Sequence, residues 1–129
     1  MRKKVVIFNE GRTTDFLLNQ KFGRHDLEVI EVSGPQQLIQ IANLTTPDVI
    51  VLNLHELSAS SLSLCKHLKQ DLNSRSARVV MLCTDFSSTK MVSAFKAGAD
   101  YYLANNDQSL PVLQHLLNTV LERRVSNVA

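Results

Sequence analysis

Residues 47–54 read Pro47-Asp48-Val49-Ile50-Val51-Leu52-Asn53-Leu54, a run that is apolar from Val49 to Leu52. Three of these four residues, Val49, Ile50 and Val51, are β-branched, which favours a strand. Apolar and polar residues do not alternate within the run, so it predicts a strand buried on both faces. The runs at residues 5–8 (VVIF) and 79–82 (VVML) are of the same kind. Together they predict the centre of a parallel sheet.

Two further segments predict the remaining strands. Residues 27–32 (LEVIEV) carry two glutamates and predict an edge strand, where a solvent-facing side is tolerated. Residues 100–103 (DYYL) form a short fifth strand.

Helical patterns separate these runs. Pro35 suits a first helical turn, Gly98 a C-terminal stop and Ser109 an N-cap. We expect the apolar faces of the helices to be formed by Leu38, Ile41 and Ala42, by Leu64, Cys65, Leu68 and Leu72, by Met91, Val92 and Phe95, and by Leu113, Leu116, Leu117, Val120 and Leu121. Residues 13–22 predict a weaker first helix. Alternating strands and helices indicate an α/β fold with a parallel sheet covered on each side.

Composition bounds the class of protein. A chain of 129 residues with 44% apolar residues suits one packed domain. The formal net charge of +2 argues against direct nucleic-acid binding driven by bulk charge. No apolar run reaches the roughly 18 residues of a membrane span, and no signal peptide is evident. Cys65 and Cys83 lack a metal-like or redox-like spacing, which favours free thiols in a cytoplasmic protein.

Function in such sheets lies beyond the carboxyl ends of the strands. Those ends are Asn9-Glu10, Asn53-Leu54, Cys83-Thr84 and Ala104-Asn105. We therefore expect the functional site there.

At these residues the chain resembles the receiver domain of two-component response regulators. The resemblance covers Lys3 to about Arg124. It is most evident in residues 47–54, residues 78–84 (RVVMLCT) and residues 97–105 (AGADYYLAN). The last stretch resembles the family's Gly-Ala-Asp-x-Tyr-Leu signature. The resemblance implies a flavodoxin-like (CheY-like) three-layer α/β/α sandwich with strand order 2-1-3-4-5. We expect a receiver-like domain at residues 1–125 and a tail at 126–129.

The resemblance also assigns site positions, and several are degenerate. Asn53 stands at the phosphate-accepting aspartate and Asn105 at the lysine. Asn9 and Glu10 stand at the acidic pair, or Phe8 and Asn9 if the match shifts by one residue. The switch positions are Cys83, with Thr84 one residue further, and Tyr102.

These residue changes affect both phosphoryl transfer and the binding of Mg²⁺. An amide is not an ionised oxygen nucleophile, and Mg²⁺ prefers carboxylate oxygens in octahedral order. With only Glu10 charged among the matched positions, we expect Mg²⁺ binding to be weak or lost and no other cofactor to be needed. We also expect the neutral amides to hydrogen-bond among themselves. His55, which follows the site, is interpreted as a loop residue, and the serines at 58–63 as helix-capping residues.

The leading hypothesis is a pseudo-receiver: a non-enzymatic domain of bacterial signal transduction that acts through protein–protein contacts without aspartate phosphorylation. Its partner is a histidine kinase or an output domain, or a second copy of the chain. By resemblance, the contact face comprises the helices around residues 91–95 and 113–121 and the strand at 100–103, with Lys90, Lys96, Tyr101 and Tyr102 as candidate contact residues. The alternatives are an atypical but functional phosphorelay receiver and a flavodoxin-like module for a small ligand. No G-x-G-x-x-G loop supports the latter.

Overall fold

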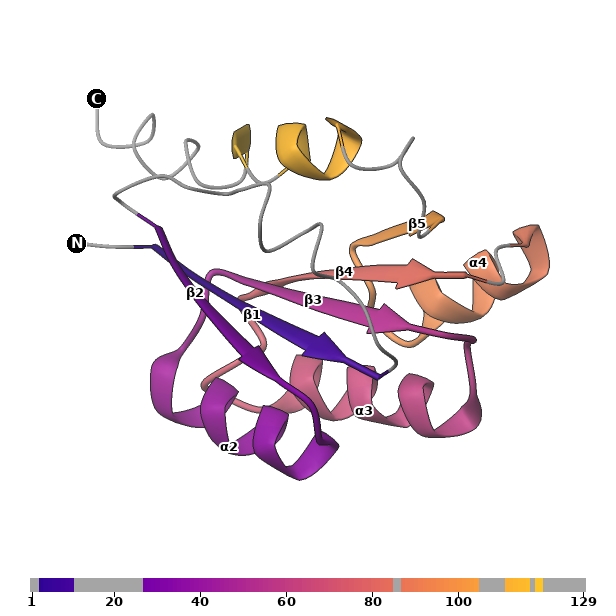
Figure 1. The fold of residues 1–129 in the computed structure, drawn as a ribbon. Helices are drawn as coiled ribbons and strands as arrows, with labels where there is room; N and C mark the ends of the chain where they lie inside the picture. The colour runs from indigo at the N-terminus through magenta and orange to yellow at the C-terminus, as the bar shows by residue number, and fades with distance from the viewer. Residues whose placement is uncertain (1–2, 11–26, 85–86, 105–110, 117, 120–129) are drawn as a thin grey trace.

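The computed structural model describes residues 3–10, 27–84, 87–104, 111–116, 118 and 119. Its elements are β1 (Lys3–Asn9), β2 (Leu27–Val32), α2 (Pro35–Thr45), β3 (Val49–Leu54), α3 (Ala59–Gln70), β4 (Arg78–Cys83), α4 (Ser88–Lys96) and β5 (Tyr101–Ala104). Residues 111–116, 118 and 119 are also helical (Figure 1). The expected helix at 13–22, the Ser109 cap and the tail at 126–129 lie outside the described residues.

The strands form one five-stranded parallel sheet in the order β2-β1-β3-β4-β5. This order confirms the flavodoxin-like prediction, and β2 is an edge strand as its glutamates indicated. The apolar runs of β1, β3 and β4 are buried, as expected for strands covered on both faces.

Alternate residues of each strand belong to two core clusters, one on each face of the sheet. The larger core cluster contains Val6, Phe8, Ile50, Leu52, Val79 and Met81 with buried residues of α2, α3 and α4. The smaller core cluster contains Val5, Ile7, Val49, Val51, Val80 and Leu82 with Leu113. Figure 1 shows α2 and α3 below the sheet and the helical segment around residue 113 above it.

Local sequence explains where the helices begin and end. Pro35 opens α2, and Thr46 ends it with a left-handed backbone (φ 45°). Ser58 caps α3 in a reciprocal arrangement with Ser61 that satisfies backbone N–H groups at the helix start. Gly98 follows the end of α4 with φ 107°, which confirms its predicted role as a stop.

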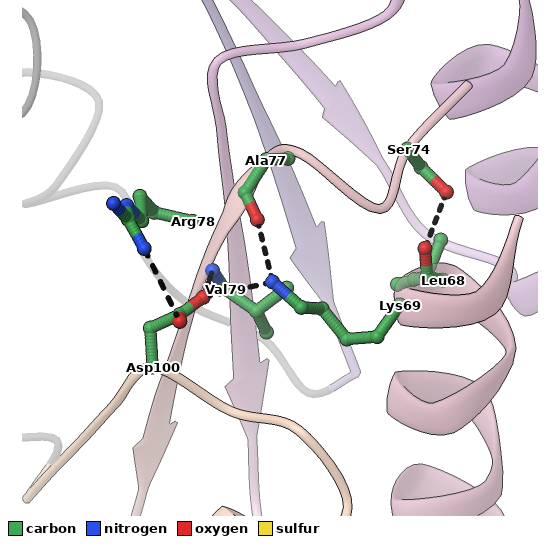
Figure 2. Close-up of polar contacts among 7 residues, drawn as sticks. All are labelled: Leu68, Lys69, Ser74, Ala77, Arg78, Val79 and Asp100. Atoms are coloured by element: carbon green, nitrogen blue, oxygen red, sulfur yellow. Dashed lines mark hydrogen bonds and ion pairs between the residues drawn. The ribbon is translucent and has the colours of Figure 1, made fainter. Parts of the chain in front are cut away.

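A polar network fixes the connection into β5 (Figure 2). Asp100 accepts hydrogen bonds from the backbone N–H of Val79 at 2.8 Å and from Nζ of Lys69 at 3.1 Å. The ammonium of Lys69 also donates to the carbonyl oxygen of Ala77 at 2.9 Å, and Arg78 lies 3.7 Å from the other Asp100 oxygen. The aspartate of the Gly-Ala-Asp motif therefore ties the start of β5 to α3 and to the start of β4.

Three apolar residues expected on buried helix faces are exposed. Leu72 lies beyond the end of α3 and is 75% exposed. Val92 and Phe95 in α4 are 54% and 46% exposed, and the residue that α4 buries is Ala94. The expectation for these three side chains is wrong: α3 ends at Gln70, before Leu72, and α4 packs on the core through Ala94 and the half-buried Met91 rather than through Val92 and Phe95.

Candidate functional site

The pairing of β1 with β3 brings Asn9 and Asn53 together. The two residues are directly opposite in the parallel register. By strand alternation both lie on the face of the smaller core cluster, and both are buried. Nδ2 of Asn53 donates a hydrogen bond to Oδ1 of Asn9 at 3.0 Å. The expectation that amides at these positions bond to each other is confirmed for this pair.

Glu31 joins the site from the edge strand β2. Nδ2 of Asn9 donates a hydrogen bond to Oε2 of Glu31. Glu31 is paired in register with Ile7, so it is the diagonal neighbour of Asn9 on the same face of the sheet. In the sequence, this glutamate indicates only an edge strand. Period-two alternation combined with strand order was the signal that could have found it.

Glu10 holds the connection between β3 and α3. Its backbone N–H donates to the carbonyl oxygen of Asn53 at 3.0 Å, and its Oε1 accepts from the backbone N–H of His55 at 3.0 Å. Glu10 and His55 are both exposed. The Glu10 carboxylate is thus engaged with a backbone donor of the loop that follows β3.

Two of the predicted switch residues, Cys83 and Tyr102, do not share a face with the amide pair. Cys83 and Tyr102 are buried in the larger core cluster, and Cys83 is paired in register with Leu54. Thr84 is exposed, and its backbone N–H donates to the carbonyl oxygen of Leu54 at 3.4 Å. The structure therefore groups Cys83 with Tyr102 and places Asn9 and Asn53 on the other side of the sheet. Asn105 lies outside the described residues.

The residues expected at a contact face differ in exposure. Lys96 is exposed, whereas Lys90 and Tyr101 are half-buried. Tyr102 is 5% exposed, so its assignment as a surface contact residue needs correction: its side chain packs inside the core. The exposed apolar side chains of Val92 and Phe95 lie on the same helix as Lys96.

Both cysteines are buried, and neither forms a disulfide. Burial raises the pKa of the Cys65 thiol to about 11, with a smaller opposing effect of Lys69. A thiol held in its neutral form is a poor nucleophile, in keeping with a packing role for this residue.

Across the described ranges, no three His, Cys, Asp or Glu side chains are grouped as a metal site requires. Within the same ranges, every helix is too short or too polar for a bilayer crossing.

Comparisons with solved structures identify the fold. A response regulator from Thermotoga maritima superposes with a TM-score of 0.80 at 17% identity, over 95% of this chain and 99% of its own. The chemotaxis response regulator CheY4 of Vibrio cholerae gives 0.74 at 17% identity, over 93% and 99%. The signal receiver domain of a histidine kinase from Syntrophus aciditrophicus gives 0.74 at 20% identity, over 93% and 90%.

No protein-family model matches the chain, and no curated protein matches it significantly. The structural likeness therefore establishes a receiver-like fold.

Proposed function

We propose that this chain is a pseudo-receiver: a signalling domain with the receiver fold that acts through protein–protein contacts without aspartate phosphorylation. The observation that carries the proposal is the hydrogen bond between the buried amides of Asn53 and Asn9. It occupies the carboxyl ends of the neighbouring inner strands β1 and β3, where α/β sheets of this kind place their functional groups.

The chemistry of Asn53 supports this proposal. Transfer of a phosphoryl group to a side chain needs an ionised oxygen aligned with the phosphorus atom. The Asn53 amide has no ionised oxygen, and its nitrogen donates to Asn9. A phosphoryl donor therefore meets no acceptor at this position.

The donor set does not fit Mg²⁺. The ion requires near-octahedral oxygen ligands and prefers carboxylates. Here Asn9 and Asn53 bond to each other, Glu31 accepts from Asn9, and Glu10 accepts from the His55 backbone. These side chains are already engaged in hydrogen bonds, and two of the four are neutral amides, so we propose that Mg²⁺ binding is weak or absent.

The partner is a protein of a bacterial signalling pathway, either a histidine kinase or an output domain, with a second copy of the chain as the alternative. The contact face includes α4, where Val92, Phe95 and Lys96 are exposed beside β5. Single exposed apolar residues are ordinary, but two on one short helix next to a lysine suit a small contact surface. In this proposal the domain has no catalytic chemistry of its own and binds neither nucleic acid nor membrane.

Intact-mass spectrometry after incubation with acetyl phosphate and Mg²⁺ tests the proposal. We expect no phosphoryl adduct on the wild-type chain. The matched variant Asn53→Asp places a carboxylate at that position. It shows whether the missing acceptor alone prevents phosphorylation. An acid-labile adduct on the wild type would overturn the proposal in favour of an atypical phosphorelay receiver. Stabilisation by nucleotides or flavins in a thermal-shift screen would instead favour a small-ligand module.

A further inference from the structure

Three side chains from three neighbouring strands form a directed chain of hydrogen bonds. Asn53 on β3 donates to Asn9 on β1, and Asn9 donates to Glu31 on β2. In both bonds the donor is an amide nitrogen, and the chain ends on a carboxylate. The two amides are buried, whereas Glu31 is exposed at the sheet edge.

The carboxylate dictates the direction of this chain. An ionised carboxylate only accepts hydrogen bonds, whereas each amide offers an oxygen acceptor at one end and a nitrogen donor at the other. If the Asn9 amide were rotated by half a turn, its oxygen would face the Glu31 carboxylate. Its nitrogen would face the side-chain nitrogen of Asn53. Both contacts would then be repulsive, so Glu31 leaves Asn9 one orientation, and Asn9 in turn orients Asn53.

We infer that Glu31 is the positioning residue of this pocket: its charge fixes the amide orientations of Asn9 and, through Asn9, of Asn53. The inference deepens the proposed function, on which it rests, because it states how the pocket keeps one arrangement without a phosphoryl group. It also explains why position 9 carries an amide. A carboxylate there would lie at hydrogen-bond distance from Glu31, and two like charges so close repel each other.

A double-mutant cycle that moves the negative charge from position 31 to position 9 tests the inference. Asn9→Asp should increase the unfolding equilibrium constant at least about fivefold, seen as a fall of about 3–6 °C in Tm. Adding Glu31→Gln should restore most of that loss, because a glutamine amide can donate to the new carboxylate while Asn53 still donates from the other side. The two hydrogen bonds then survive with the negative charge moved from β2 to β1. All measurements are made in EDTA, so that no cation bridges the carboxylates.

Two control variants separate position from net charge. Glu28→Gln makes the same charge change on β2, and Glu10→Gln makes it beside position 9. Neither should rescue Asn9→Asp as Glu31→Gln does. Equal rescue by either control, or failure of the double variant to regain stability or to fold, would overturn the inference.

Side-chain amide signals in ¹H–¹⁵N NMR spectra supply a second readout that does not depend on the Asn9→Asp variant. Glu31→Gln should shift the signals of both Asn9 and Asn53, although Glu31 is not bonded to Asn53. A shift confined to Asn9 would contradict the relay. Neither experiment involves phosphorylation. A phosphoryl adduct on the wild type would therefore overturn the proposed function, whereas the stability measurements on the variants test the role of Glu31 independently.

Discussion

Nζ of Lys69 lies 3.1 Å from Oδ2 of Asp100, the oxygen that also accepts the Val79 backbone N–H. Lys69 is in α3, whereas Asp100 directly precedes β5, so this ion pair spans 31 positions of the chain (Figure 2). Both side chains are only about one-fifth exposed. This partial burial makes the contact stronger than an ordinary surface pair.

Asp100→Ala should therefore destabilise the fold by about 2–3 kcal/mol, because it removes a charged acceptor from a backbone donor and from an ammonium group. Urea unfolding followed by circular dichroism measures the change. Arg78→Gln is the matched control: the 3.7 Å contact of Arg78 with Asp100 is half exposed, and its loss should cost less than about 1 kcal/mol. Similar losses for both variants would contradict this account.

Gly98→Ala should cost about 2–3 kcal/mol for two reasons, a positive φ that disfavours a side chain and crowding by Lys69. A Cβ atom at Gly98 would lie 2.8 Å from Cγ of Lys69, whose ammonium is held by Ala77 and Asp100. Gly34→Ala is the control: φ there is −119°, an added Cβ atom would meet no atom within 4 Å apart from its chain neighbours, and the change should stay within about 1 kcal/mol. Chemical denaturation of both variants measures the difference, and equal losses would contradict the crowding argument.

The strands were predictable because their information is local. Unbroken runs such as Val79–Leu82 indicate burial on two faces without knowledge of their neighbours, and the two glutamates of β2 marked a sheet edge. The Gly98 stop was predictable for the same reason, since a single residue determines the local backbone. The strand order followed from the family resemblance.

The site was less predictable because it depends on the register between strands. The Asn9–Asn53 bond was expected from residue types at matched positions, whereas the role of Glu31 depends on β2 lying beside β1 with Glu31 diagonal to Asn9. Most predicted helix faces, such as Leu64 and Leu68 of α3, are buried. The prediction was wrong for Val92 and Phe95, because α4 packs through Ala94 and the half-buried Met91.

Ser58→Ala should cost about 1 kcal/mol, the usual value of a lost N-cap. The Ser58 hydroxyl accepts the backbone N–H of Ser61, which has no partner within the first helical turn. Ser60→Ala, an exposed change in the same turn, should be nearly neutral. Thermal unfolding of the pair measures the difference, and an equal effect of both changes would remove the cap as the cause.

Phe95→Ser should change stability by less than about 1 kcal/mol, because this side chain is half exposed. Ala94→Leu, one position earlier, should cost about 1–3 kcal/mol or more by overpacking a fully buried position. Urea unfolding of the two variants compares them. A larger loss for Phe95→Ser would mean that α4 packs through Phe95 and not through Ala94.

The free energy of unfolding should fall as pH rises from about 9 towards 11, and the Cys65 thiol should account for part of this fall. The ordinary pKa of the thiol is 9.0, and burial raises it to about 11 in the folded chain. Between these values the unfolded chain loses the thiol proton while the folded chain keeps it, so rising pH favours unfolding. Free energies of unfolding for the wild type and for Cys65→Ala, measured at about pH 8 and about pH 10, isolate this part. Cys65→Ala lowers stability at both pH values through the cavity that it leaves, but it should show a smaller fall between them. Parallel pH profiles for the two proteins would mean that the thiol ionises alike in the folded and unfolded states.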